Sequence, residues 1–219
     1  MELAVVKFLS ALKKNNNKPW FDSHRPQYES VKNHFRSFVS EMIVHISRFD
    51  HSIARLESKD CMFRINRDVR FSKDKRPYKN NFAAYFNKGG KKGGGGGYYI
   101  HIEPGNSFAA VGVWMPPPDE LAKIRQEIDY NYIEWKNILS EKGFKKTFGG
   151  KLDWGETLVR PPKGYTEENP AIEYLKLKSF VAIVPLTDKE LVAVDLVKRL
   201  STIFQAGQPL LAFINRSLD

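Results

Sequence analysis

The spacing of apolar residues changes at Cys61, and this change constrains the fold more than any other feature of the sequence. In the first fifty residues apolar side chains recur every three or four positions, as on the buried face of an amphipathic helix. From Cys61 they alternate with polar residues, as in a strand with one buried face. Helical spacing returns after Pro118. This order is typical of an α+β protein with a mostly antiparallel sheet.

No shift in composition marks a linker, so the sequence predicts a single domain over residues 1–219. Ser23 is expected to cap the second helix, with Pro26 in its first turn. A capping box at Thr187 is expected to open a late helix, and a short last helix to follow Pro209. The expected parts are N-terminal helices at about 2–50, a sheet at about 61–115 that starts with a strand at 61–71, an irregular segment at 143–163, a central strand at 180–186, and a helical and mixed C-terminal half at about 117–219.

Positive charge is concentrated in one stretch of the chain. The 219 residues include 35 Lys and Arg against 25 Asp and Glu, which gives a formal net charge of +10. Residues 59–92 hold eleven of these cations and three aspartates, so this window alone carries an excess of eight positive charges. Crowded like charges destabilise a fold unless something offsets them. The pattern therefore indicates a solvated surface or a site for an anion.

Residues 63–81 are rich in Arg and Lys, the side-chain types that are suited to binding phosphate. Arginine is a planar fork of donors, and lysines in a turn-rich loop act as mobile charges. Arg67 falls on the apolar side of the alternation, so it is expected to turn outward on a bulge or to need a partner. The expected anion-binding residues are Arg64, Arg67, Arg70, Lys73, Lys75, Tyr78 and Lys79, with the Tyr78 ring also a candidate for base stacking. The alternative is a lattice of salt bridges on a solvated face, although exposed pairs contribute only about 0–1 kcal/mol each.

Whether the chain is an enzyme stays open at this point. Asp68 and Asp74 are candidates for acid–base groups, but carboxylates among so many cations have lowered pKa values and are weak bases. His101 and Glu103 share one face of an expected strand and are further candidates, as an acid–base pair or as two metal ligands. No third ligand is evident, so neither a metal nor another cofactor is predicted. The alternative for this pair is an ordinary polar face of a hairpin.

Two further features bear on class and compartment. Residues 88–97 are seven glycines and three lysines and fail the pattern of a phosphate-binding loop, so a flexible hairpin connection is expected. Cys61 is the single cysteine, which excludes an internal disulfide and fits a reducing compartment. No secretory signal and no apolar run of about 18 residues is visible. A cytoplasmic protein without a membrane segment is expected.

Several motifs resemble the uncharacterised family known as domain of unknown function 2461. They are N-N-N-K-P-W-F-D at 15–22, F-R-x-x-R-D-x-R-F-S-x-D-K-x-P-Y-K at 63–79, G-Y-Y-I-H at 97–101, G-V-W-M-P at 112–116, R-P-P-K-G-Y at 160–165 and L-x-L-K-S at 175–179. The resemblance covers nearly the whole chain and implies a soluble single domain of bacterial type. It implies no activity or ligand, and the Gly/Lys stretch at 88–97 departs from the pattern.

Two hypotheses about function follow from the charge. The first is a site for a phosphate-bearing ligand, a nucleotide or a nucleic acid, at residues 63–81, with phosphoester chemistry as an extension. The second is a non-catalytic module whose basic face docks an acidic protein. Membrane docking is less natural, because the cations lie on an expected strand and loop rather than on an amphipathic helix. The sequence gives no indication of the oligomeric state.

Overall fold

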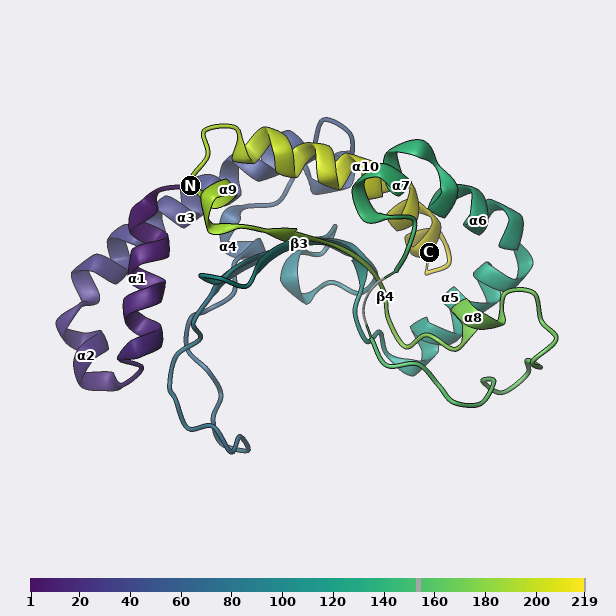
Figure 1. Ribbon diagram of the computed structural model, residues 1–219, viewed down its shortest axis with the longest axis horizontal. Helices are drawn as coiled ribbons and strands as arrows, with labels where there is room; N and C mark the ends of the chain where they lie inside the picture. The colour runs from purple at the N-terminus through teal and green to yellow at the C-terminus, as the bar shows by residue number, and fades with distance from the viewer. Residues whose placement is uncertain (153–154, 219) are drawn as a thin grey trace. The chain divides into compact units, whose positions relative to one another are not determined.

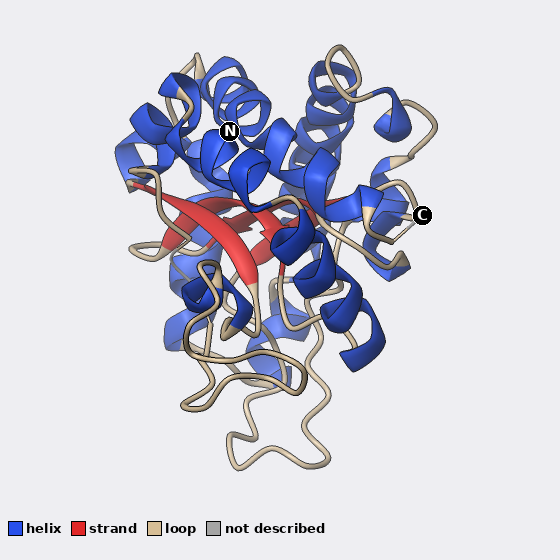
Figure 2. Cartoon of the chain, turned by 90° about the vertical axis from the view of Figure 1, so that its right-hand side faces the viewer, coloured by secondary structure: helices blue, strands red, loops and turns tan. Residues whose placement is uncertain are grey.

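The computed structural model describes residues 1–152 and 155–218, and in them the chain has the expected α+β fold (Figure 1, Figure 2). Four strands form one antiparallel sheet in the order β1-β2-β3-β4. The strands are β1 (Phe82–Phe86), β2 (Gly97–Ile102), β3 (Ser107–Val113) and β4 (Phe180–Leu186). The run at 180–186 is therefore a strand, but the prediction that it is central was wrong, because it pairs only with β3 at an edge.

The described chain divides into two compact units. Unit 1 comprises Met1–Lys91, Tyr99–Ala109 and Pro185–Ser201, and unit 2 comprises Lys92–Tyr98, Ala110–Val184 and Thr202–Asp219. Strands β2, β3 and β4 each contribute residues to both units. The single domain over residues 1–219 stays a prediction.

Unit 1 contains the N-terminal helices. They are α1 (Leu3–Lys14), α2 (Lys18–Ser23), α3 (Arg25–Ile46), η1 (His51–Ile53) and α4 (Ser58–Cys61), joined by α9 (Asp188–Leu191) and the first residues of α10 (Leu196–Arg216). Asn17 caps α2 by accepting from the Trp20 amide. Ser23 does not cap α3 as predicted. Its hydroxyl donates to the Trp20 carbonyl, and His24 takes the cap position.

The core of unit 1 forms where α3 packs on the sheet. The Phe35 ring stacks on that of Phe82 in β1 at 5.2 Å between centroids. On β2, Ile100 and Ile102 are fully buried. Because side chains alternate along a strand, this burial turns Tyr99, His101 and Glu103 to the opposite face. That face carries part of the candidate site.

Unit 2 contains the central and C-terminal helices. They are α5 (Pro118–Tyr130), α6 (Tyr132–Ser140), α7 (Lys142–Phe148), α8 (Ile172–Leu175) and the rest of α10. Trp135 is fully buried between Phe180 and Phe213.

Two boundaries in the C-terminal half differ from the prediction. The segment at 143–163 was predicted to be irregular, but it starts in α7, because Glu141 caps that helix through the Phe144 amide. Residues 153–154 of that segment lie outside the described part of the chain. The Thr187 capping box is present and opens α9. Pro209 lies inside α10 rather than before a separate last helix.

The strand expected at 61–71 is not formed. Helix α4 ends at Cys61, and residues 63–81, here called the basic loop, form two extended runs joined by an isolated bridge between Asn66 and Tyr78. The Arg67 amide donates to Pro77 O at 2.9 Å and the Lys79 amide to Ile65 O at 2.8 Å. Proline has no amide to continue such a ladder. Figure 1 shows the loop as adjacent runs of chain that extend away from the sheet.

The Gly/Lys stretch at 88–97 connects the neighbouring strands β1 and β2, as predicted, and its flexibility stays a prediction. It contains a short turn of 3-10 helix, η2 (Gly90–Lys92), in which the Gly90 amide donates to Asn87 O at 2.7 Å. The Gly96 amide donates to Asn215 Oδ1 at 2.7 Å, and a Cβ at Gly96 would lie 2.8 Å from Leu211. A side chain at position 96 would therefore require the end of the Leu211 side chain to shift.

Gly112 in β3 provides a test of the sheet. A Cβ there would lie 1.9 Å from Phe180 O, at a φ of +138°. We expect Gly112→Ala to lower the free energy of unfolding by about 2–5 kcal/mol, the sum of backbone strain and overpacking. Gly105→Ala is the control, since its φ of +77° is also left-handed but nothing lies within 4 Å. Equal losses for the two variants in urea denaturation would contradict the β3–β4 packing.

Candidate functional site

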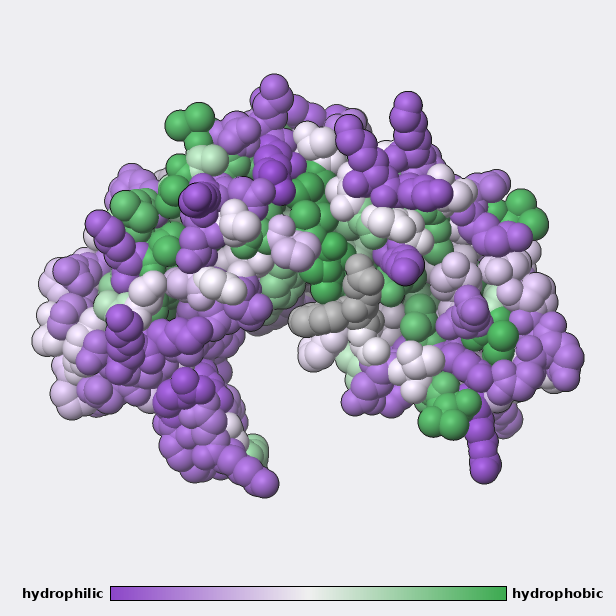
Figure 3. Space-filling view, in the orientation of Figure 1, coloured by the Kyte–Doolittle hydropathy of each residue, from purple (hydrophilic) through white to green (hydrophobic). Residues whose placement is uncertain are grey.

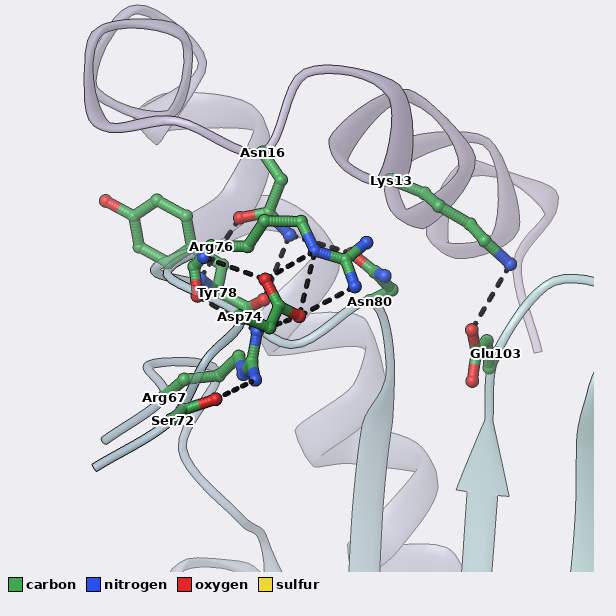
Figure 4. A network of polar contacts seen from close by, with 9 residues as sticks. All are labelled: Lys13, Asn16, Arg67, Ser72, Asp74, Arg76, Tyr78, Asn80 and Glu103. Atoms are coloured by element: carbon green, nitrogen blue, oxygen red, sulfur yellow. Dashed lines mark hydrogen bonds and ion pairs between the residues drawn. The ribbon is translucent and has the colours of Figure 1, made fainter. Parts of the chain in front are cut away.

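Asp74 joins two arginines of the basic loop (Figure 4). Arg67 Nη1 donates to Asp74 Oδ2 at 2.6 Å, and Arg76 Nη2 donates to the same oxygen at 2.7 Å. This supplies the partner that the sequence predicted for Arg67. Hydrogen bonds from Arg76, and then from Arg67, hold the pKa of Asp74 far below its usual value. Asp74 is therefore a structural carboxylate and a poor candidate for a general base.

The base of the loop is anchored by Asn16, which the sequence analysis did not single out. Its side-chain amide donates to Tyr78 O at 2.9 Å and to Asn80 Oδ1 at 2.8 Å, and its oxygen accepts from the Tyr78 amide at 3.1 Å. The Tyr78 ring is 6% exposed and stacks on Phe21 at 3.9 Å. The sequence had suggested that Tyr78 stacks on a base, but its ring packs in the core and is therefore not available to do so.

A second, local ion pair lies farther along the loop. Arg70 donates from Nε and Nη2 to the two oxygens of Asp68, at 3.0 and 2.7 Å. Hydrogen bonds from Arg70 lower the pKa of Asp68, so this candidate too is a weak base. The Arg70 side chain stays 76% exposed. Lys75 donates to the carbonyls of Val69 and Arg70 and has no carboxylate partner among the described residues.

The remaining cations of the loop are not paired with a carboxylate of the described residues. Within residues 1–152 and 155–218, Arg64, Lys73 and Lys79 have no carboxylate at ion-pair distance. The Lys79 ammonium lies 5.4 Å from the centroid of the Phe63 ring. Burial, and then the charge of Arg64, lowers the pKa of Lys79. Arg64 and Lys79 thus form a pair of like charges at the base of the loop.

His101 lies on the neighbouring sheet face with a defined tautomer. Its Nδ1 is 2.9 Å from Asn81 Nδ2 and 3.2 Å from the Tyr99 hydroxyl, and its Nε2 is 3.2 Å from Glu103 Oε2. An amide nitrogen can only donate, so Nδ1 accepts and Nε2 carries the proton. Burial lowers the pKa of His101, against the raising effect of Glu103. The ring is neutral at pH 7.

Glu103 remains ionised beside this neutral ring. Burial alone would raise the pKa of Glu103, but hydrogen bonds from His101, Asn106 and Lys13 together lower it. Lys13 Nζ lies 3.3 Å from Glu103 Oε1 (Figure 4). A carboxylate behind a neutral imidazole is the arrangement of a general base. Tyr99 is not a matching nucleophile, since burial raises its pKa to about 12.

Aromatic rings connect the two parts of the site. Phe63 meets Tyr99 edge-on at 6.2 Å, and Phe108 stacks on His101 at 4.8 Å. Lys79 is close enough to depress the pKa of His101. The sheet-face site, as we call it, therefore consists of Arg64, Lys79, Phe63, Tyr99, His101, Glu103 and Phe108. The sequence predicted its cations and the His–Glu pair but missed the rings that join them.

Neither a metal centre nor a membrane span is found in the described part of the chain. Its His, Cys, Asp and Glu residues form no cluster of three that could hold a metal ion. Across the same residues, no helix combines the length and apolar character needed to cross a bilayer. The argument about function therefore rests on the basic loop and the sheet-face site.

Residues 4–213 match the family model described as conserved hypothetical protein (DUF2461). The chain belongs to this family. The match confirms the resemblance noted in the motifs and spans the basic loop, the sheet-face site and both compact units. No curated protein and no solved structure matches the chain. The description of DUF2461 names no activity, so the function has to be argued from the residues.

The tautomer and pKa of His101 can be measured by nitrogen-15 NMR. We expect the Nε2–H form and a titration midpoint below 6.5, because burial favours the neutral ring. Between that midpoint and 6.5 the unfolded chain binds a proton that the folded chain does not, so the free energy of unfolding falls as pH falls. His101→Gln should remove this part of the pH dependence in urea denaturation. A midpoint above 6.5, or a proton on Nδ1, would contradict the assignment.

Proposed function

We propose that this chain binds a phosphate-bearing ligand, a nucleotide or a nucleic acid, through the basic loop and the sheet-face site. The observation that carries the proposal is the pair Arg64 and Lys79, adjacent cations without a carboxylate among the described residues. A half-buried ammonium with a lowered pKa is destabilised in its charged form. An external anion would offset that cost. A cytoplasmic location, where such ligands are abundant, is part of the proposal.

Internal pairing does not account for the charge of the loop. It contains seven Lys and Arg and only two aspartates, Asp68 and Asp74. Both aspartates are used by arginines, namely Arg67, Arg70 and Arg76. These pairs fix the loop while leaving an excess of five positive charges along it. Such an excess favours association with polyanions.

The rings beside the cations favour a nucleotide over an acidic protein. Phe63 lies beside Lys79, and Tyr99 and Phe108 follow it in a chain of ring contacts. All three rings are half-buried, so part of each surface can meet a planar ligand. Bases stack on such rings in proteins that bind single strands. The alternative, a module that docks an acidic partner through the loop, needs the cations but not the rings.

Phosphoester hydrolysis is a second candidate function, favoured by the state of His101. A neutral ring held by Glu103 can take a proton at Nδ1 from an attacking water. Asn81 and Tyr99 now donate to the single lone pair of that nitrogen, so the water would have to replace both donors. Turnover on a phosphodiester that is lost in His101→Gln, with ligand binding retained, would support this function.

Neutralising the cations of the sheet-face site should weaken ligand binding. We expect Arg64→Gln and Lys79→Gln each to lower the affinity for a labelled oligonucleotide by about tenfold, the loss of one charge-assisted hydrogen bond. The log–log salt slope should also decrease by about 0.7 for a single strand. Fluorescence anisotropy over a range of salt concentrations measures both quantities.

The matched control is Lys7→Gln, which removes an exposed cation from α1 in the same unit. Its affinity and salt slope should equal those of the unchanged protein. If Arg64→Gln and Lys79→Gln fold normally and bind as the unchanged protein does, these residues are not in the site. Equal binding of poly-glutamate and of the oligonucleotide would favour the acidic-protein alternative.

Removing the local partner of Arg70 should have the opposite effect. Asp68→Asn frees an exposed guanidinium and cancels a negative charge, so we expect a few-fold tighter oligonucleotide binding and a steeper salt slope. Asp22→Asn is the control, because it breaks a similar exposed pair between Asp22 on α2 and Arg25 on α3. Weaker binding in Asp68→Asn would mean that this pair shapes the site instead of limiting its charge.

A further inference from the structure

We infer that the ligand of the basic loop is single-stranded nucleic acid and that Phe71 is a platform on which an unpaired base stacks. This inference rests on the proposed function and deepens it. Phe71 lies between the two extended runs of the loop and is 95% exposed. The sequence predicted anion-binding cations in this loop, but it gave no reason to expect an exposed ring at position 71.

The exposure of Phe71 is not explained by the stability of the fold. A phenylalanine side chain normally stabilises a protein when it is buried away from water. The Phe71 side chain is almost completely exposed, so it contributes little in this way. Its ring lies 5.8 Å from the guanidinium carbon of Arg70. Figure 3 shows a projection of almost wholly hydrophilic residues with a small apolar spot near its end. A lone apolar ring among cations is suited to a ligand that carries both negative charge and planar faces.

The distribution of cations favours a polymer over a mononucleotide. Arg64 and Lys79 lie at the base of the loop, whereas Arg70 and Lys73 flank Phe71 in sequence. Arg64 and Phe71 are seven residues apart along an extended run, a reach of up to about 25 Å. A polynucleotide strand repeats its phosphates about every 3.4 Å, so it can contact both groups at any separation within this limit.

Unpaired bases fit this surface better than a duplex or a membrane. In a duplex the base faces are already stacked, so inserting a ring requires unstacking, whereas a single strand offers free faces. An anionic bilayer would also accept one aromatic ring among cations. It could engage Phe71, but the half-buried rings Phe63, Tyr99 and Phe108 on the sheet face would gain nothing from it. A strand that runs along the loop reaches both sets of rings.

Phe71→Ala separates stacking from charge. We expect it to weaken binding of oligo(dT) by roughly 5- to 150-fold, the range measured when a stacking ring is removed. The salt slope should not change, because no charge is lost. Binding of inorganic polyphosphate of the same length, which has charge but no bases, should also be unchanged. Phe71→Trp should retain oligo(dT) affinity and show quenched tryptophan emission on binding, measured against the unchanged protein with its four tryptophans.

Val194→Ala is the matched control, because Val194 is another fully exposed apolar side chain in unit 1. It should leave all affinities unchanged, and the melting temperature of Phe71→Ala should match that of the unchanged protein. Unaltered oligo(dT) binding by Phe71→Ala, or an equal loss for polyphosphate, would overturn stacking. Loss of binding to phosphatidylserine vesicles alone would overturn it in favour of a membrane.

These outcomes stay distinct from the failure of the proposed function. If Arg64→Gln and Lys79→Gln weaken binding but Phe71→Ala does not, anion binding stands and the stacking inference fails. If oligo(dT), polyphosphate and a mononucleotide all fail to bind the unchanged protein at low salt, the proposed function fails and the inference with it.

Discussion

The shape of the basic loop depends on the Asp74 carboxylate. Arg67 and Arg76 come from opposite runs of the loop, and both donate to one of its oxygens. Without this shared acceptor, two guanidinium groups would face each other at short range. Together with Asn16 at the base, Asp74 lets a stretch with only an isolated bridge keep an extended form. The remaining cations are displayed on this frame, and the proposed function uses them.

Much of the fold follows from local patterns, and the exceptions have physical causes. The helical stripe of α3, the Asn-rich break after α1 and the Thr187 capping box are encoded within a few residues, so they could be predicted. The alternation after Cys61 suggested a strand, but a strand also needs a neighbour along its length. Pro77 and the charged side chains leave residues 63–81 with one isolated bridge instead. That β4 lies at an edge depends on long-range pairing that no local pattern reveals.

The sequence predicted those parts of the candidate site whose contacts are local, and it missed the contacts between distant residues. In each Arg–Asp pair, and in the His101–Glu103 pair, the two partners are separated by fewer than about ten residues, so spacing alone suggested them. Asn16 contacts Tyr78 from 62 residues away, and Asn81, the last residue of the basic loop, contacts His101 from 20 residues away, so no local spacing reveals either contact. Tyr78 was misjudged because an aromatic residue among cations looks the same in sequence whether it packs on Phe21 or faces solvent. The exposure of Phe71 likewise becomes visible only in three dimensions.

The two halves of the sheet-face site are coupled through charge. Burial is the largest cause of the lowered pKa in both His101 and Lys79, and a neighbouring cation adds to it in each, Lys79 for His101 and Arg64 for Lys79. An anion bound between them would reverse both effects and raise both pKa values. By linkage, ligand binding would then raise the proton affinity of these groups, and protonation would raise the affinity for the ligand by the same factor. Protonation of His101 at Nδ1 would also break the hydrogen bond that Asn81 donates to this nitrogen. The loss of this bond would limit the rise in the pKa of His101. A phosphate bound beside Lys79, as proposed, would favour the charged forms of both groups.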